Sequence, residues 1–243
     1  MASRALEFLT VLPTAKHTAS VIVLHGLGDS GHGWRPVAQM LAKDPKLAHV
    51  KWILPHAHDN PVTLNMGMSM PSWFDIESLE LDTNDELGGE DSKGMLASSV
   101  LVNQIITAEV DEANIPADRI VIGGFSQGAA LSLLTGLTSE RRLGGIFALS
   151  GWLPLSGKIK SMMSDRAQSL PIFFGHGTSD PVVQYKYGKQ SYNLLKSLGF
   201  QDATAESIKG LSWQEYAGMG HSSSPRELQD IASWLARVVP QNT

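Results

Sequence analysis

Short runs of hydrophobic residues alternate along the chain with longer segments in which hydrophobic residues recur every three or four positions. Several of the short runs end at Gly or Pro, and they are rich in Val, Ile and Phe, which is typical of strands buried in a parallel sheet. These runs are 8–12, 21–24, 50–54, 120–122, 146–149, 172–174 and, more weakly, 213–216. Because Pro13 ends the first run, we expect that run to form a short edge strand.

The longer segments predict helices at 36–43, 92–114, 127–137 and 184–198, and a last helix after Ser224. The last helix has the clearest start signals. Ser224 is the expected N-cap, Pro225 fits the first helical position, and Glu227 completes a capping box. Alternation of strands and helices predicts an α/β fold with a mostly parallel central sheet and helices on both faces.

The length and composition of the chain fit one soluble globular domain. The chain has 243 residues, 42% of them hydrophobic and 18% charged, so a sizeable core can form. We find no internal repeat or low-complexity linker and therefore expect a single domain over 1–243. The net charge is −5, and no run of Lys and Arg is present. This charge pattern argues against nucleic acid as a partner.

The chain contains no cysteine, which excludes disulfides, cysteine-based metal sites, a cysteine nucleophile and S-acylation of the protein itself. No cluster of His, Asp and Glu has metal-ligand spacing, so no metal and no other cofactor is expected. The first residues lack the hydrophobic core of a secretory signal, and no stretch reaches the roughly 20 apolar residues of a spanning helix. We expect a cytoplasmic protein, with the nucleus as a further compartment left open.

The sequence Gly-Phe-Ser-Gln-Gly at 124–128 lies between the strand at 120–122 and the helix at 127–137. A serine in a G-x-S-x-G motif between a strand and a helix sits on a tight turn, with its hydroxyl exposed above the sheet. The glycines on either side let neighbouring backbone pass close by. Ser126 is therefore the candidate nucleophile.

A serine hydroxyl needs a base within hydrogen-bond reach, and the base needs a third group that fixes its tautomer. In this architecture the chain order is Ser, acid, His, each on a loop after a strand. His221 follows the strand at 213–216 and precedes the last helix, so it is the candidate base. Asp180 lies in a glycine-containing turn after the strand at 172–174 and is the candidate acid.

Other polar residues fit these roles less well. His176 precedes Asp180, so the chain order disfavours it as the base. Asp202 lies in a polar loop with no strand before it, and Asp230 lies within the last helix. We assign the remaining candidate histidines to loops or packing: His25, His32, His56, His58 and His176.

An acyl-transfer site also needs two backbone N–H groups aimed at the developing oxyanion. One should come from Gln127, the residue after the nucleophile. The other should come from the glycine-rich loop 25–29, which follows the strand at 21–24. We expect Leu27 to supply it, because its amide can point inward while its side chain flanks the pocket.

Six stretches in the expected order carry a family resemblance: 23–29, 71–75, 123–129, 148–154, 175–183 and 218–221. The chain resembles the acyl-protein thioesterase and lysophospholipase family, close relatives of microbial carboxylesterases with the α/β-hydrolase fold. The resemblance implies hydrolysis of long-chain S-acyl groups on protein cysteines, and often of lysophospholipids and small esters. It implies S-acylated proteins and acyl lipids as partners, with transient contact to a membrane surface.

The segment 62–81 is rich in methionine and aromatic residues. Flexible thioethers suit an acyl chain of variable length, and the resemblance implies that this segment covers an acyl channel. The alternative is that its side chains simply pack against the core. The candidate substrate-binding residues are Leu27, Met66, Met70, Trp73, Phe74, Leu79 and Trp152.

Two rival functions stay open. A carboxylesterase for short or xenobiotic esters would use the same three residues with a shorter pocket. A ligand receptor or scaffold could keep the hydrolase fold without turnover. One departure from the family also matters, because animal members commonly carry an N-terminal cysteine that can be acylated, and this chain has none. Self-acylation is therefore not available as a membrane tether.

Overall fold

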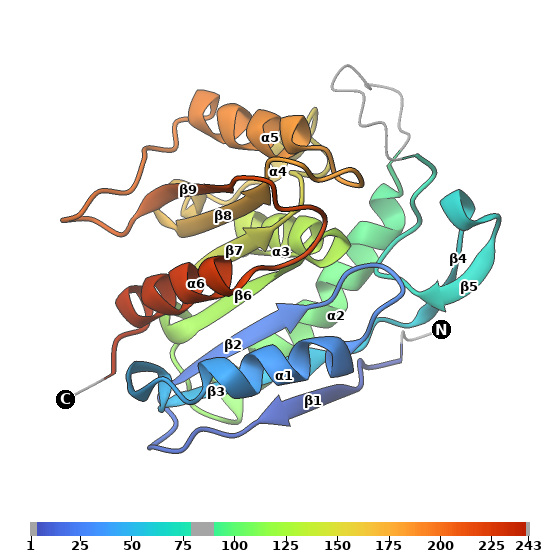
Figure 1. Cartoon of the computed structure of the whole chain (residues 1–243). Helices are drawn as coiled ribbons and strands as arrows, with labels where there is room; N and C mark the ends of the chain where they lie inside the picture. The colour runs from blue at the N-terminus through green and yellow to red at the C-terminus, as the bar shows by residue number, and fades with distance from the viewer. Residues whose placement is uncertain (1–3, 79–89, 242–243) are drawn as a thin grey trace.

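The computed structural model describes residues 4–78 and 90–241. Its centre is a seven-stranded sheet in the spatial order β1-β3-β2-β6-β7-β8-β9 (Figure 1). In that order the strands are β1 (Phe8–Val11), β3 (Val50–Pro55), β2 (Ala19–Leu24), β6 (Ile120–Phe125), β7 (Gly145–Leu149), β8 (Pro171–Gly177) and β9 (Gly210–Tyr216). All neighbours are parallel except β1, which pairs with β3 antiparallel at the edge. The predicted α/β architecture is confirmed.

Alternate residues of the strands face two separate hydrophobic cores, one on each side of the sheet. The helices that flank the sheet are α1 (Gly31–Leu41), α2 (Ser92–Asp111), α3 (Gln127–Thr138), α5 (Tyr185–Ser197) and α6 (Pro225–Val238). Ile22, Ile122 and Ile172 pack with α2, α3 and α5. On the other face, Val21 and Val121 pack with α1 and α6. The sheet is thus covered on both faces, as its continuous hydrophobic strands require.

The first helix begins earlier than predicted. The prediction placed its start at Pro36, but α1 begins at Gly31, because the Ser30 side chain caps it by accepting a hydrogen bond from the His32 amide. Pro36 lies within the helix. Ser30 was the available sequence signal for the start of the helix. Gly31 and Gly33 follow it, and glycine disfavours helix, so the start was placed too late.

The capping box predicted for α6 forms only in part. The Ser224 side chain accepts a hydrogen bond from the Glu227 amide at 3.2 Å, and Pro225 opens the helix as predicted. The reciprocal contact, from the Ser224 amide to the Glu227 carboxylate, lowers the pKa of the carboxyl group but falls outside the geometry of a hydrogen bond. The carboxylate is fully buried, and neither oxygen has a partner at hydrogen-bond geometry among residues 4–78 and 90–241. An added Cβ at Gly175 of β8 would lie 2.4 Å from Glu227 Oε1, so this carboxylate packs directly on the sheet.

A small hairpin, not predicted as strands, projects from one side of the molecule. It consists of β4 (Asp59–Val62) and β5 (Met68–Pro71), paired antiparallel. Figure 1 shows it beyond the carboxyl ends of the central strands, on the side of the loop that follows β9. Its tip carries hydrophobic side chains into solvent: Met66 is 90% exposed and Met68 is 54% exposed.

The remaining elements are short: α4 (Ile159–Met162) and the 3-10 turns η1 (Pro45–Leu47), η2 (Thr63–Asn65), η3 (Ala117–Arg119) and η4 (Ala167–Ser169). In the described part of the chain, no helix combines the length and hydrophobicity needed to cross a bilayer.

Candidate active site

Ser126 lies on the sharp turn between β6 and α3. Its φ of 54° is in the left-handed region, and its amide donates to the Leu149 carbonyl at 2.9 Å. Two flanking glycines make room for this turn. An added Cβ at Gly128 would lie 2.2 Å from the Leu24 carbonyl oxygen, and one at Gly124 would lie 2.4 Å from the same atom. The turn therefore presents the serine beside the end of β2.

The three candidate residues of the relay lie within hydrogen-bond distance of one another. Ser126 Oγ is 3.0 Å from His221 Nε2, and His221 Nδ1 is 2.8 Å from Asp180 Oδ2. With the imidazole proton on Nδ1, His221 donates to Asp180 and leaves Nε2 free to accept the serine proton. This is the nucleophile, base and acid geometry of a serine hydrolase.

Asp180 is fixed on both oxygens. Its Oδ1 accepts hydrogen bonds from the Val182 and Val183 amides at 2.9 and 3.0 Å, which leaves Oδ2 for His221. The side chain is 0% exposed. His176 lies alongside: its Nε2 donates to the Val183 carbonyl at 2.8 Å and is 3.7 Å from Asp180 Oδ2. Burial lowers the pKa of His176, so its neutral ring supports the loop without adding a charge.

The two expected oxyanion donors are available. Neither the Leu27 amide nor the Gln127 amide donates a hydrogen bond to any part of the chain that the structure describes. Gly26 packs against the nucleophile, since an added Cβ there would lie 3.4 Å from Ser126 Cβ. Gly28, with φ of 77°, turns the loop so that its amide donates to the Pro71 carbonyl at 2.9 Å.

The segment 71–74 holds both sides of this site, a role that sequence analysis missed. The buried Gln127 side chain accepts from the Trp73 amide at 3.0 Å and donates to Ser72 Oγ and the Phe74 carbonyl. The Trp73 indole donates to the His25 carbonyl at 2.8 Å. The available signal was a polar Ser72 beside two aromatic residues, which does not identify its partners.

The structure gathers some of the candidate substrate-binding residues and not others. Met70 lies next to Gly28, where an added Cβ would be 3.7 Å from Met70 Sδ. Phe74 and Trp152 are buried and meet edge to face at 6.2 Å between ring centroids. Trp73 is buried beside His25, and Leu27 is partly buried. Met66 is exposed at the hairpin tip and does not join this group, and Leu79 lies outside the described residues.

Within residues 4–78 and 90–241, no three His, Asp or Glu side chains cluster in a way that could hold a metal ion.

Comparison with known proteins identifies the family. The sequence profile of the phospholipase/carboxylesterase family matches residues 7–239. The chain is 50% identical over 239 residues to acyl-protein thioesterase 1 of Cryptococcus neoformans var. neoformans, with 97% of this chain and 98% of that protein covered. It is 45% identical to acyl-protein thioesterase 1 of Mycosarcoma maydis, with the same coverage of 97% and 98%.

Solved structures of plant proteins share the fold. Arabidopsis thaliana SOBER1 superposes with a TM-score of 0.81 at 35% identity, covering 91% of this chain and 99% of that one. Zea mays acyl-protein thioesterase 2 gives a TM-score of 0.79 at 30% identity, covering 96% and 99%. With these matches over nearly its whole length, the chain belongs to the phospholipase/carboxylesterase family and has the α/β-hydrolase fold.

Proposed function

We propose that this protein is a serine hydrolase that cleaves S-acyl thioesters, palmitoyl groups in particular, from cysteines of other proteins. The observation that carries the proposal is the hydrogen-bonded relay from Ser126 through His221 to Asp180 beside two unengaged backbone amides. The choice of a thioester substrate is supported by relatives named acyl-protein thioesterase 1 at up to 50% identity. No cofactor is needed for this chemistry.

In the acylation half, His221 Nε2 takes the Ser126 proton as Oγ attacks the thioester carbonyl carbon. The carbonyl oxygen gains the negative charge, and the Leu27 and Gln127 amides stabilise it. Asp180 stabilises the imidazolium through Nδ1. The C–S bond then breaks, and His221 returns the proton to the departing cysteine sulfur.

In the deacylation half, His221 takes a proton from water, and the hydroxide attacks the acyl-Ser126 ester. The same two amides stabilise the second oxyanion. The C–O bond to Ser126 breaks, the serine recovers its proton from His221, and the fatty acid leaves. Each proton taken by His221 is returned, so the net reaction converts the thioester and one water into a thiol and a fatty acid.

Hydrophobic residues near the site support a bound acyl chain. Leu27, Met70, Phe74 and Trp152 are the proposed lining, with Trp73 beside them.

A short-chain carboxylesterase is the second candidate function, and one observation favours it. Trp73 and Phe74 are each only 2% exposed, and the 71–74 backbone is hydrogen-bonded in place, so these rings do not themselves leave an open channel. Lysophospholipid esters fit the same chemistry.

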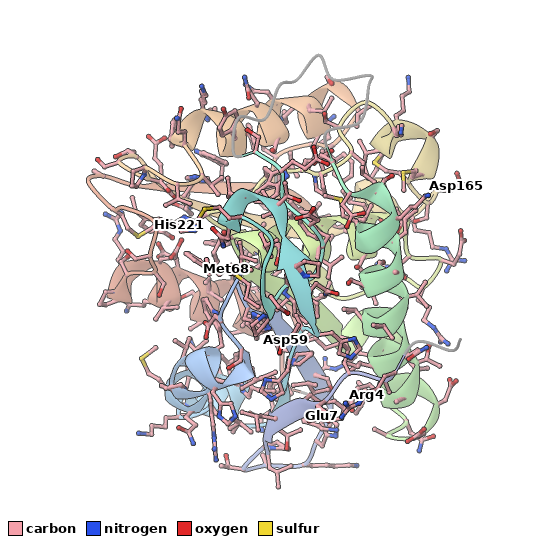
Figure 2. All side chains as sticks on the ribbon, turned by 90° about the vertical axis from the view of Figure 1, so that its right-hand side faces the viewer. Arg4, Glu7, Asp59, Met68, Asp165 and His221 are labelled. Carbon is pink, nitrogen blue, oxygen red and sulfur yellow. The ribbon has the colours of Figure 1, made fainter. Side chains whose placement is uncertain are left out.

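A membrane contact is part of the proposed function, because S-acylated proteins sit on membranes. The hairpin tip places Leu64, Met66 and Met68 in solvent, and Figure 2 views the hairpin that carries Met68 from its exposed side. Exposed hydrophobic side chains gathered on one projection mark an interaction site. We propose that this tip rests on the lipid surface and that the protein acts from the cytoplasm.

The test is the initial rate of hydrolysis of S-acylated cysteine peptides as the acyl chain lengthens from acetyl to palmitoyl. We expect kcat/KM to rise toward long chains. A maximum at acetyl or butyryl, with collapse beyond, would support the short-chain carboxylesterase instead.

The matched control is Ser126→Ala, which removes one oxygen and leaves the turn. It should lower kcat by about 10⁴-fold or more and abolish labelling by an active-site fluorophosphonate. An unchanged rate would remove Ser126 as the nucleophile. A wild-type protein that neither reacts with the probe nor turns over any acyl length would favour a receptor or scaffold.

A further inference from the structure

We propose that His25 is a positioning residue that sets the direction of the oxyanion donor on Leu27. The inference rests on the proposed serine-hydrolase function and concerns a residue that sequence analysis assigned to packing. His25 directly follows β2, which ends at Leu24, and is fully buried. Both of its ring nitrogens are engaged, and each engages backbone of a different segment.

The hydrogen bonds of His25 fix its tautomer. The Ala57 amide is a donor, and it lies 3.0 Å from Nε2, so Nε2 must accept. The remaining proton is therefore on Nδ1, which donates to the Gly26 carbonyl at 2.7 Å. The ring also contacts the Trp73 ring, tilted by 39° with 5.0 Å between centroids, and the Trp73 indole donates to the His25 carbonyl.

The bond to Gly26 controls the Leu27 amide through the peptide plane. The Gly26 carbonyl and the Leu27 N–H belong to the same planar trans peptide, so they point in opposite directions. Holding the carbonyl on His25 Nδ1 aims the N–H away from the histidine. The Asp29 amide adds a second, longer bond to the same carbonyl at 3.2 Å. The amide of Leu27 stays free because the other side of its peptide is doubly held.

The same network reaches the second donor. Trp73 bonds His25 with its indole and the Gln127 side chain with its backbone amide. The segment 71–74 therefore contacts both the residue that orients the Leu27 peptide, His25, and the side chain of Gln127. Fixed donors cost no reorganisation when the oxyanion forms, which is the source of this kind of catalysis.

The test uses two replacements that each keep one ring position. In His25→Asn the side-chain amide takes the place of Nδ1, and in His25→Gln it takes the place of Nε2. Buried His49, whose Nε2 donates to the Val239 carbonyl at the opposite end of the sheet, supplies His49→Asn and His49→Gln as controls. For each variant, kcat and KM are measured with p-nitrophenyl butyrate, together with thermal unfolding and the affinity for a trifluoromethyl ketone.

We expect His25→Gln to lower kcat roughly 30-fold with KM changed by less than about threefold, and to weaken the ketone in parallel, since outright loss of a donor costs 100-fold or more. His25→Asn should recover most of that loss, and the His49 pair should change only unfolding. Two results would overturn the proposal. One is an equal loss of kcat in His25→Asn and His25→Gln that parallels their loss of thermal stability, and the other is an unchanged kcat in both variants.

A measurement on the unsubstituted protein needs neither turnover nor a folded variant. With ¹⁵N-labelled histidine, His25 should show a neutral Nδ1–H ring that does not titrate, in addition to the Nδ1–H ring of His221. Burial lowers the pKa of His25, in keeping with a ring that stays neutral. An Nε2–H or charged His25 would overturn the inference even if the protein hydrolyses thioesters, and an Nδ1–H His25 in a protein that hydrolyses nothing would count against the proposed function alone.

Discussion

Three histidines around the site differ in what their ring nitrogens contact. His221 links Ser126 to Asp180, His176 braces the loop that carries Asp180, and His25 holds the Gly26 carbonyl. Burial lowers the pKa of His25 and His176. Their rings therefore stay neutral at pH values where an exposed histidine would begin to charge, and the field at the nucleophile does not change with them.

Glu227 presents the opposite case, a buried carboxylate whose oxygens have no partner at hydrogen-bond geometry in the described part of the chain. Burial raises its pKa to about 8, against a smaller lowering effect of the Ser224 amide. In the unfolded chain the same group titrates near its ordinary value of 4.5. Between these two values the unfolded state releases a proton that the folded state retains, so the free energy of unfolding decreases as pH rises through this window.

Glu227→Gln should therefore flatten the pH dependence of stability. We expect the variant to exceed the original protein by about 1–2 kcal/mol at pH 8, where one pKa unit corresponds to about 1.4 kcal/mol, and the difference to vanish or reverse at pH 5. The buried amide also lacks partners, which limits the gain. Urea unfolding from pH 5 to 8.5 measures this, with exposed Glu140→Gln as the control. An identical pH slope in both proteins would show that Glu227 is already ionised in the fold.

At this scale the sequence predicted the positions of Ser126, Asp180 and His221, because each follows a strand in a fixed chain order. The task of His25 could not be predicted, since it depends on the Ala57 amide reaching its Nε2 across 32 positions of the chain. The capping box of Ser224 and Glu227 was predicted from its spacing and forms in part. The spacing does not show that the Glu227 carboxylate is also buried against Gly175.

Among the elements, the contact of α3 with β2 determines the position of the proposed nucleophile, Ser126. Gly128 in the first turn of α3 faces the Leu24 and His25 carbonyl oxygens, which an added Cβ would approach to 2.2 and 2.5 Å. Backbone atoms cannot move aside as a flexible side chain can. A methyl group here must therefore push the helix, and Ser126 with it, away from the sheet.

Gly128→Ala should destabilise the protein by about 3 kcal/mol or more and lower kcat even in the fraction that remains folded. Gly157→Ala is the matched control, because an added Cβ there meets nothing within 4 Å. Thermal unfolding and ester hydrolysis of the two variants measure the contrast. Similar unfolding temperatures for the two would mean that α3 can shift without cost.

Elements with strong periodicity were predictable, and those set by local contacts were not. The continuous hydrophobic strands and α6 appear where expected, with bounds that differ by a few residues. The β4–β5 hairpin was missed because each strand has four residues and contains a proline, which demotes a strand prediction. Its pairing is nevertheless compatible with Pro61 and Pro71, since the two-stranded sheet has open edges on both sides.

For the molecule as a whole, the net charge of −5 bears on the membrane contact proposed above. Anionic lipids repel a protein of negative net charge, so the proposed contact relies on hydrophobic side chains. The hairpin tip, with Met66 and Met68 exposed, is the projection suited to that contact. Binding of this kind should appear with neutral phosphatidylcholine vesicles and persist in high salt.

Replacing both Met66 and Met68 with Asp should reduce sedimentation with phosphatidylcholine vesicles about tenfold, because burying one Met side chain contributes up to about 1.5–3 kcal/mol. Met40→Asp on α1, which is 48% exposed, is the control for added charge and lost hydrophobic surface elsewhere. Equal loss of binding in both variants would indicate nonspecific adsorption, and retained binding in the double variant would exclude the tip as the contact.

The hydrogen bonds of the segment 71–74 to the Gln127 side chain and to the loop 25–28 have an engineering consequence. The hairpin stem is anchored at its base, whereas Met66 and Met68 at its tip are exposed. The tip between positions 62 and 70 can therefore be replaced by the corresponding segment of a relative. The hydrogen bonds of residues 71–74 should be unchanged by this replacement. If the proposed membrane contact holds, affinity for a lipid surface can be varied independently of hydrolysis.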